Sequence, residues 1–503
     1  MLKVHSSIDI HQQPDVTARH MWVCYCALIL ILSLIVAIFE STQTALAVCA
    51  VLISPALIVL LELWRFDRLL MALMFVLSNL FLLHGIVAVK LPDGRVLFGI
   101  RDILWLLVLV VGLVKGHDRL RELAKHPLIW PGLLLLCLAP FAALIGMING
   151  GSLSDIIREV YPYTAWAIAL VVCANVTDHK TLRFLTGFFI LIGVLTSIGA
   201  IAEVMSNGDI KLVSTYSEQF LSVGIRVWPD GWVFMFVTLV YAAVALTVHS
   251  ENKRSQFWVG VIVLVSVSFA MTQMRGMLLT FIGAILLLLM AVTFYRVQWI
   301  KLRRLALPSL ALCCLSLLGW SVLADSFGSN TVFSIAERYS YAQLSEDTWE
   351  RQFEVTHVLD KWESHPLTGV GFGVPYYDIP VVPVYGLGDV RMFVHNILAY
   401  HLLKFGPVGL ALFVVFCLSA ANSFLLSVKS GYDPTVTLTR LALTLGLVGL
   451  VVEAQAANVF GDARQISVSA IVIGLIVCSE RLQRVSTQLA SASPNTTLGA
   501  HVQ

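Results

Sequence analysis

The chain has 503 residues, of which 58% are hydrophobic and only 13% are charged, and its mean hydropathy is +0.85. A soluble chain of this length needs far more charge on its surface, so a soluble globular protein is excluded and a polytopic membrane protein is expected. The net charge of +2 carries little information compared with the places where lysine and arginine fall. The nine cysteines lie in apolar stretches without the clustered Cys and His pattern of a metal site, so we expect packing residues and no metal centre.

Fourteen apolar runs of the sequence are candidate transmembrane spans. A bilayer core of roughly 30 Å needs about 20 residues per helix. The first run follows a polar N-terminus and is too long for the core of a signal peptide, so we expect a spanning helix there rather than a cleaved signal. The predicted fold class is an all-α polytopic membrane protein with about 12–14 transmembrane helices. The spans are predicted near 21–40, 44–64, 69–90, 98–115, 127–148, 160–176, 182–204, 231–249, 257–274, 276–295, 304–323, 400–426, 437–459 and 464–480.

Lysine and arginine clusters set the predicted orientation, because such clusters in short loops resist translocation. With the N-terminus in the cytoplasm, every such cluster lies on the cytoplasmic side, for example the one from Lys115 to Lys125, and the C-terminus lies there too. The opposite orientation would translocate all of them. This orientation leaves one long loop, 324–394, on the periplasmic side, together with the segment 205–230 and the tight turn at Arg275.

The sequence shows no internal repeat, so 1–503 is treated as one integral membrane domain. Its end, 485–503, is rich in Ser, Thr and Ala and predicts a disordered cytoplasmic tail. Inside the long loop, residues 347–366 predict one amphipathic helix, which Pro366 ends. We expect this helix to be a lid that packs on the membrane domain, with a substrate-facing helix as the alternative. Its apolar residues at helical spacing are Trp349, Phe353, Val355, Val358, Leu359 and Trp362.

The stretch from His365 to Gly409 differs from the apolar helices around it and contains the candidate catalytic residue. Its glycine segment GVGFG, 369–373, lacks the following Lys-Ser/Thr and the strand-to-helix setting of a phosphate loop, so it predicts a tight turn or close backbone packing. His395 lies where this loop enters an apolar helix, and a helix N-terminus favours its neutral, proton-accepting imidazole. A lone histidine is usually structural. The irregular, polar neighbourhood of His395 makes it a functional candidate.

Two arginines share the predicted outer side with His395. Arg226 lies just before a predicted span, and Arg275 has apolar sequence on both sides and no local carboxylate. An arginine at bilayer depth is costly unless it meets an anion or lines a cavity, and its planar fork suits phosphate oxygens. Snorkelling to lipid head groups explains one isolated arginine equally well, but two on the side of His395 favour a shared anion site. His401 and Lys404, further along the helix that His395 begins, are weaker candidates.

The pattern HN at 395–396, nine residues, and then GPVG at 406–409 resembles the H-N-x9-G-x-x-G signature of bacterial O-antigen ligases. Their relatives include the Wzy-type polysaccharide polymerases and the bacterial O-linked oligosaccharyltransferases. The preceding HPLTGVGFG is similar to the family's approach to that histidine, and MTQMRG resembles its arginine-bearing helix end, with Arg275 in the matching place. Arg226 is a looser match, because its flanking sequence is not diagnostic. The resemblance covers an O-antigen ligase-related core at roughly 231–426.

The resemblance implies a glycosyltransferase that takes a glycan from undecaprenyl diphosphate at the periplasmic face of the bacterial inner membrane. It implies an inverting transfer to a hydroxyl of the lipid A core or of a growing polysaccharide, without metal, cofactor or nucleotide sugar. His395 is then expected to accept the proton of that hydroxyl, while Arg226 and Arg275 hold the diphosphate. Membrane lipids are further expected partners, and no nucleic acid is expected. The expected supporting residues are Asn396, Gly406 and Gly409.

Alternatives stay open at two levels. Within the family, the acceptor distinguishes a ligase, a polymerase and a protein-targeting transferase, and its recognition is expected to lie in 324–394. From a different class, a flippase for lipid-linked oligosaccharides has a similar number of spans and also needs cations for a diphosphate. Such a transporter more often shows related halves and short outer loops, so the enzyme is favoured. A non-catalytic assembly subunit is a third reading.

Overall fold

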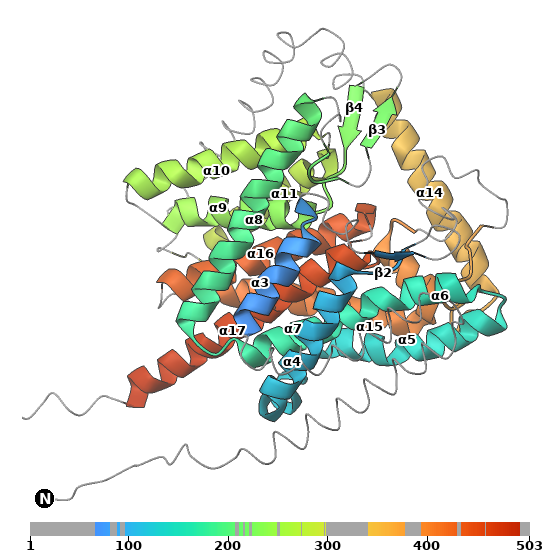
Figure 1. Cartoon of the computed structure of the whole chain (residues 1–503), viewed down its shortest axis with the longest axis horizontal. Coiled ribbons are helices and arrows are strands. Elements are labelled where there is room, and N and C mark those ends of the chain that lie inside the picture. The colour runs from blue at the N-terminus through green and yellow to red at the C-terminus, as the bar shows by residue number, and fades with distance from the viewer. Residues whose placement is uncertain are drawn as a thin grey trace, which may run out of the picture.

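The computed structural model of the chain consists mainly of α-helices, with two short β-hairpins (Figure 1). It describes residues 66–80, 88–90, 96–206, 211–214, 217–220, 224–248, 252–272, 274–295, 297, 341–377, 394–429, 434–457 and 459–492. The helices are α3 (Phe66–Leu77), α4 (Ile100–Leu123), α5 (Trp130–Ile148), α6 (Leu153–Val160), the 3-10 helix η2 (Tyr161–Thr164), α7 (Ala165–Asn175), α8 (His179–Met205), α9 (Trp232–Val248), α10 (Asn252–Met271), α11 (Arg275–Phe294), α14 (Tyr341–Glu363), α15 (Ile397–Lys429), α16 (Pro434–Ala457) and α17 (Ala463–Ala492). The strands are β1 (Ala88–Lys90), β2 (Val96–Gly99), β3 (Ser217–Phe220) and β4 (Gly224–Val227).

Eight helical segments in the described part of the chain are long and apolar enough to cross a membrane. The 17-residue α9 is apolar as well but shorter. These segments confirm the predicted class, an all-α polytopic membrane protein. The spans predicted near 21–40, 44–64 and 304–323 lie outside the described residues. The eight segments are α5, the continuous run from α6 to α7, α8, α10, α11, α15, α16 and α17.

The span predicted at 69–90 is wrong in its second half. α3 ends at Leu77, and residues 88–90 form β1, which pairs antiparallel with β2. The helix stops because Asn79 adopts a left-handed backbone conformation with φ of 55°, while the Ser78 hydroxyl donates to the carbonyl of Phe75 at 2.6 Å. Asparagine is one of the few residues that tolerate this conformation, and it ends helices for that reason.

The predicted C-terminal tail also begins too early, because α17 continues to Ala492. Residues 485–492 contain no glycine or proline, so nothing in their sequence ends the helix. The hydroxyl of Ser486 donates back to the carbonyl of Leu482 at 3.0 Å, as serine in a helix commonly does. Residues 493–503 lie outside the described part of the chain.

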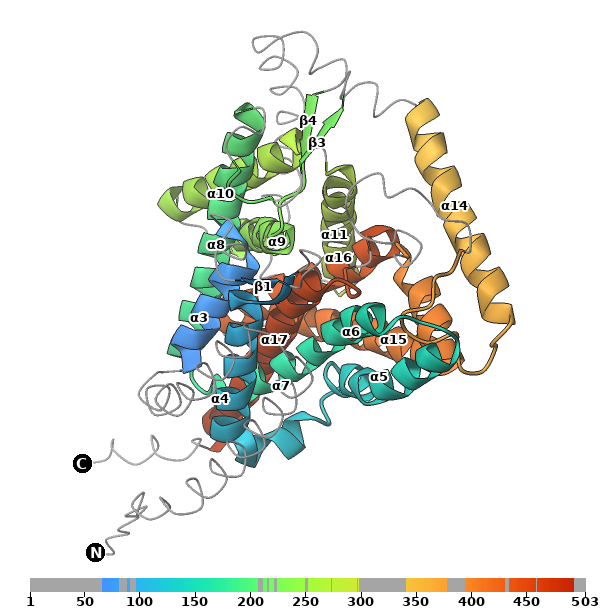
Figure 2. The same cartoon turned by 45° about the vertical axis from the view of Figure 1, so that its right-hand side comes forward.

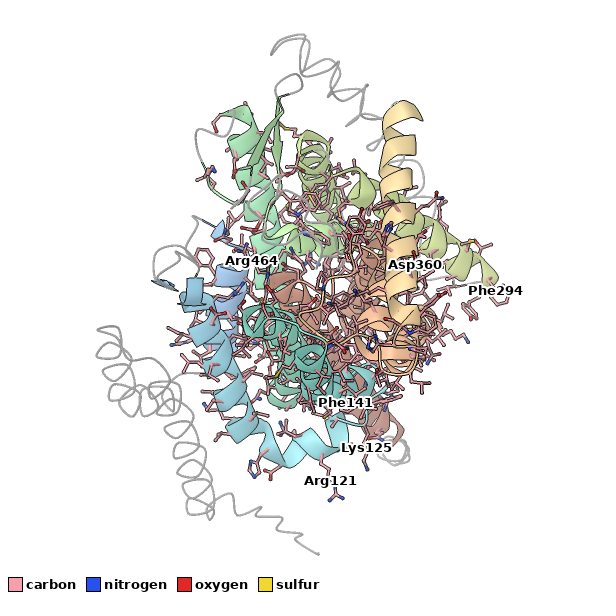
Figure 3. All side chains as sticks on the ribbon, turned by 90° about the vertical axis from the view of Figure 1, so that its right-hand side faces the viewer. Arg121, Lys125, Phe141, Phe294, Asp360 and Arg464 are labelled. Atoms are coloured by element: carbon pink, nitrogen blue, oxygen red, sulfur yellow. The ribbon has the colours of Figure 1, made fainter. Side chains whose placement is uncertain are left out.

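Helices α7, α9, α16 and α17 form the interior of the molecule. Almost every residue of α9 is buried, and in the most apolar stretches of α16 and α17 the buried share of the residues is 83% and 94%. A helix that is apolar all round belongs in such a core. In the corresponding stretches of α5 and α11 only 33% and 39% of the residues are buried. Large apolar side chains such as Phe294 point outward from these helices (Figure 3). Their outward faces therefore suit contact with lipid.

α15 is broken at Gly406-Pro407. Gly406 has φ of +67° and ψ of −161°, and Pro407 has no N–H to donate to the carbonyl four residues earlier, that of Leu403. The N–H of Val370 in the glycine segment donates to this carbonyl instead, at 2.7 Å. The freed helical group thus finds its partner in an irregular segment that is distant in sequence.

The glycine segment 369–373 makes the close backbone contacts that its sequence predicts. Its three glycines have φ of +67°, +81° and +75°, a region that glycine enters without strain. The N–H of Phe372, between the last two glycines, donates to the carbonyl of Ala142 on α5 at 3.0 Å. The segment therefore packs between α5 and α15, and the side chain of Phe372 is fully buried.

Replacing Gly406 by alanine is expected to lower the free energy of unfolding by about 1–3 kcal/mol. Alanine is strained at this positive φ, and its Cβ would overlap the carbonyl oxygen of Leu367. Thermal unfolding of the detergent-solubilised protein measures the effect. Gly187→Ala in α8 is the matched control, because a Cβ there meets nothing within 4 Å. Equal unfolding midpoints for the two variants would contradict the role assigned to the break.

Candidate functional site

The amphipathic helix predicted in the long loop is α14, and it brings a carboxylate to His395. α14 lies along one side of the molecule and packs against α15 (Figures 1 and 2), which confirms the expected packing on the membrane domain. The helix begins at Tyr341, earlier than predicted, and ends at Glu363, before Pro366. His395 and Asn396 lie directly before the first residue of α15.

Glu354 on α14 holds His395 by its ring and by its backbone. The Oε2 atom of Glu354 lies 2.6 Å from His395 Nδ1, and Oε1 accepts the backbone N–H of His395 at 2.5 Å. The backbone N–H of Asn396 also approaches Oε1, at 3.4 Å. The Glu354 side chain is only 8% exposed, whereas that of His395 is 32% exposed. The acid is thus enclosed, and the imidazole still reaches the surface.

This contact selects the tautomer of His395. An ionised carboxylate only accepts hydrogen bonds, so Nδ1 carries a proton and donates it to Glu354. In the neutral ring the accepting lone pair is then on Nε2. Hydrogen bonds to charged groups are worth about 1.5–3 kcal/mol each. Glu354 therefore fixes the orientation of the ring and stabilises an imidazolium if Nε2 takes up a proton.

Asn396 has a separate task, because it caps α15. Its side-chain Oδ1 accepts the N–H of Ala399 at 3.0 Å, and its carbonyl accepts the N–H of Tyr400 at 2.9 Å. This is the usual N-cap arrangement, in which the side chain satisfies an N–H that has no helical partner. The cap fixes where the helix begins and hence where the neighbouring His395 sits.

Glu354 was not among the residues singled out from the sequence. A signal existed, because Glu354 lies four residues before the buried Val358 and so belongs to the buried face of α14. A carboxylate on the apolar face of an amphipathic helix needs a partner inside the protein. The sequence alone does not say which residue that partner is.

Gly406 and Gly409 shape the turn of α15 that follows the site. Gly406 adopts the positive φ at the break, and a Cβ on Gly409 would overlap the side chain of Phe405. His401 and Lys404, the weaker candidates on this helix, are both buried. His401 Nδ1 lies 2.8 Å from the carbonyl of Ile397, and its ring stacks on Phe413, so it belongs to the aromatic core.

The two candidate arginines lie on separate elements. Arg275 is the first residue of α11, and Arg226 lies on β4 opposite Glu218 of β3. Only the backbones of both arginines belong to the described part of the molecule. The described atoms bring His395 together with Glu354 and Asn396, and they contain no contact between His395 and either arginine.

A buried carboxylate lies beside the start of α11. Glu453 of α16 accepts the hydroxyl of Thr280 at 2.6 Å, and it is 6% exposed. A Cβ on Gly276, the residue after Arg275, would lie 2.6 Å from Glu453 Oε1. The glycine of the MTQMRG segment therefore makes room for this carboxylate against the first turn of the helix.

The segment that carries Arg226 is anchored at its base. The carboxylate of Glu203, at the end of α8, accepts the backbone N–H groups of residues 212–214 at 3.1 to 3.2 Å. The N–H of Asp230 donates to the carbonyl of Val213 at 2.9 Å, and the Asp230 side chain pairs with Arg464. The segment that contains the β3–β4 hairpin is therefore held at both ends, by the buried Glu203 at residues 212–214 and by the half-buried Asp230 through Val213 and Arg464.

The fold and the site define a polytopic membrane protein with a histidine oriented by a buried carboxylate. Among the described residues no group of three or more His, Cys, Asp or Glu side chains is arranged to hold a metal ion. A family model described as O-Antigen ligase matches residues 260–414, a range that includes Arg275, Glu354 and His395 and that Arg226 precedes. The match confirms the resemblance: residues 260–414 carry the O-antigen ligase signature of the O-antigen ligase and Wzy-type polymerase family. No curated protein matches the sequence.

Removal of the Glu354 carboxylate is expected to loosen the start of α15. In Glu354→Ala the backbone N–H groups of His395 and Asn396 lose their acceptor, so they should exchange with solvent at least about tenfold faster. Hydrogen–deuterium exchange followed by mass spectrometry on the peptide that spans 394–399 measures this. Asp360→Asn, an exposed acid on the same helix, is the control and should leave the exchange unchanged (Figure 3). Unchanged exchange in Glu354→Ala would contradict the anchoring role.

Proposed function

We propose that this membrane enzyme transfers a glycan from an undecaprenyl-diphosphate donor to an acceptor hydroxyl. The observation that carries the proposal is the contact of His395 with Glu354 inside the matched range 260–414. A histidine whose Nδ1–H is held by a carboxylate has the orientation of a general base, and the family supplies the class of reaction.

In the proposed reaction, Nε2 of His395 accepts the proton of the acceptor hydroxyl as its oxygen attacks the anomeric carbon. A new C–O bond forms, and the bond from the anomeric carbon to the diphosphate oxygen breaks. The electron pair of that bond leaves with the diphosphate. Attack opposite the leaving group inverts the anomeric configuration, and no covalent glycosyl-enzyme is formed. Glu354 stabilises the imidazolium until it releases its proton to water.

Arg226 and Arg275 are the proposed diphosphate ligands. Their guanidinium groups would match the charge that develops on the diphosphate as the glycosidic bond breaks, so the scheme uses neither a metal nor a nucleotide sugar. Two observations support the assignment. Arg275 heads α11, whose N-terminus adds partial positive charge, and Arg226 lies on a hairpin with an anchored base.

The proposed acceptor is the lipid A core, which makes the enzyme an O-antigen ligase; a growing polysaccharide as acceptor would make it a polymerase of the same family. The reaction is proposed for the periplasmic face of the inner membrane, with both chain ends in the cytoplasm, as the lysine and arginine pattern predicts. The glycan profile of a deletion strain separates the two acceptors. A ligase mutant retains long lipid-linked polymer that is not attached, whereas a polymerase mutant lacks the long polymer.

His395→Ala is expected to lower the rate of glycan transfer by about 10²–10⁴-fold, because the general base is lost. Arg275→Ala is expected to lower it by about 10²–10³-fold through lost charge stabilisation. Transfer from a lipid-diphosphate donor by the purified protein in liposomes measures both. Asp360→Asn and Arg121→Ala, at exposed positions that Figure 3 labels, are the matched controls and should keep the wild-type rate.

Near wild-type transfer by folded His395→Ala or Arg275→Ala protein would overturn the mechanism. The same liposomes test the transporter reading. An enzyme forms a new glycosidic bond on the acceptor, whereas a flippase changes only the leaflet in which the donor is found. Donor movement without a new bond would reject the transferase.

A further inference from the structure

An ion pair with a fully buried lysine joins α15 to α6 a short distance along the chain from His395. The Lys404 side chain has no exposed surface, and its Nζ lies 3.0 Å from Oε2 of Glu159, which is 10% exposed. A charge withdrawn from solvent in this way costs several kcal/mol unless hydrogen bonds surround it. Two apolar side chains of similar volume would often fill such a site at no loss of stability, so a retained charge pair here points to a task other than packing.

Both members of the pair also hold the backbone of the glycine segment. Lys404 Nζ donates to the carbonyl of Val374 at 2.8 Å, and the N–H of Gly373 donates to Glu159 Oε2 at 2.5 Å. The lysine therefore binds a carbonyl, and the glutamate binds the adjacent N–H group. The charges suit these contacts, because the Lys404 ammonium meets a carbonyl acceptor and the Glu159 carboxylate meets an N–H donor.

The segment held by this pair is the direct continuation of α14. The chain leaves α14 at Glu363 and reaches the clamped residues 373–374 after nine residues of irregular backbone. Within this stretch, the N–H of Val370 donates to the carbonyl of Leu403 on α15. α14 and the chain that follows it therefore meet α15 and its start at two side-chain contacts, besides the backbone bond of Val370. One is the contact of Glu354 with His395, and the other is the clamp at Lys404.

We propose that Lys404 and Glu159 are positioning residues, which hold the end of α14 on α15 and so set the geometry between Glu354 and His395. This inference rests on the proposed function, because it concerns the orientation of the proposed base. In the described part of the molecule neither Lys404 nor Glu159 contacts the proposed base, and the arginines assigned to the donor lie on other elements, β4 and α11. Its loss should therefore lower kcat and leave the KM for the lipid-linked donor unchanged.

The test uses Glu159→Gln/Lys404→Met, in which neither partner is left as an unpaired buried charge. Glycan transfer by the full-length protein in liposomes should show kcat lower by about 10²-fold, which is the effect of a displacement of about 1 Å in a catalytic group. Lys429→Met, at the far end of α15 where its Nζ lies over the Tyr295 ring, is the matched control and should keep the wild-type kcat.

A double-mutant comparison separates positioning from a merely structural role. If the clamp acts through Glu354, adding Glu354→Gln to Glu159→Gln/Lys404→Met should cost little beyond the larger of the two separate losses. Losses that multiply would overturn the inference. A charge-reversed pair, Glu159→Lys/Lys404→Glu, should not restore kcat, because it sets a carboxylate against the Val374 carbonyl; restored kcat would also overturn it.

Two further outcomes keep this inference distinct from the proposed function. If His395→Ala is inactive and Glu159→Gln/Lys404→Met retains the wild-type kcat, the positioning role is wrong and the proposed function stands. If His395→Ala is itself active, the proposed function fails first. Should the neutral pair not fold, Glu159→Asp keeps the charge and draws the carboxylate back by one methylene. It should lower kcat at an unchanged unfolding midpoint, and an unchanged kcat would overturn the positioning role.

Discussion

The buried backbone of residues 369–374 must find all its hydrogen-bond partners inside the protein, because each unpaired N–H or C=O group costs about 1–3 kcal/mol. Its partners include groups of α5, α6 and α15, together with the Asn149 side chain and the His365 carbonyl. α15 can offer a backbone carbonyl only because Pro407 leaves that of Leu403 without its helical donor. The break in one helix and the glycine segment therefore require each other, and the rest of the site is arranged around this joint.

The features that depend on local sequence could be predicted. Apolar runs, the proline at the break and the glycines with positive φ each follow from chemistry within a few residues, and the class of protein follows from composition. The contact of Glu354 with His395 joins residues 41 positions apart. Several acids lie in the same predicted loop, and no local pattern says which of them meets the histidine. Tertiary packing of α14 on α15 makes that choice.

The predictions that were wrong or too weak also failed because they were made from local sequence alone. The span predicted at 69–90 continues past Asn79 because its hydropathy stays high, although a single left-handed residue ends the helix. Lys404 looked like a weak candidate because an isolated lysine in an apolar helix has no visible partner. Its partners are a carboxylate on α6 and a carbonyl of the glycine segment, and both arrive through the fold.

The chain between Val374 and His395 starts and ends at anchored positions: Lys404 of α15 holds the Val374 carbonyl, and Glu354 of α14 holds the His395 N–H. Loop closure between fixed ends changes little with length, by about 0.6 kcal/mol for each doubling. A change of length between these two anchored points is therefore expected to leave the contact of Glu354 with His395 in place. A change at Gly406 or Pro407 would instead remove an anchor itself, because the Leu403 carbonyl that holds Val370 is available only at the break.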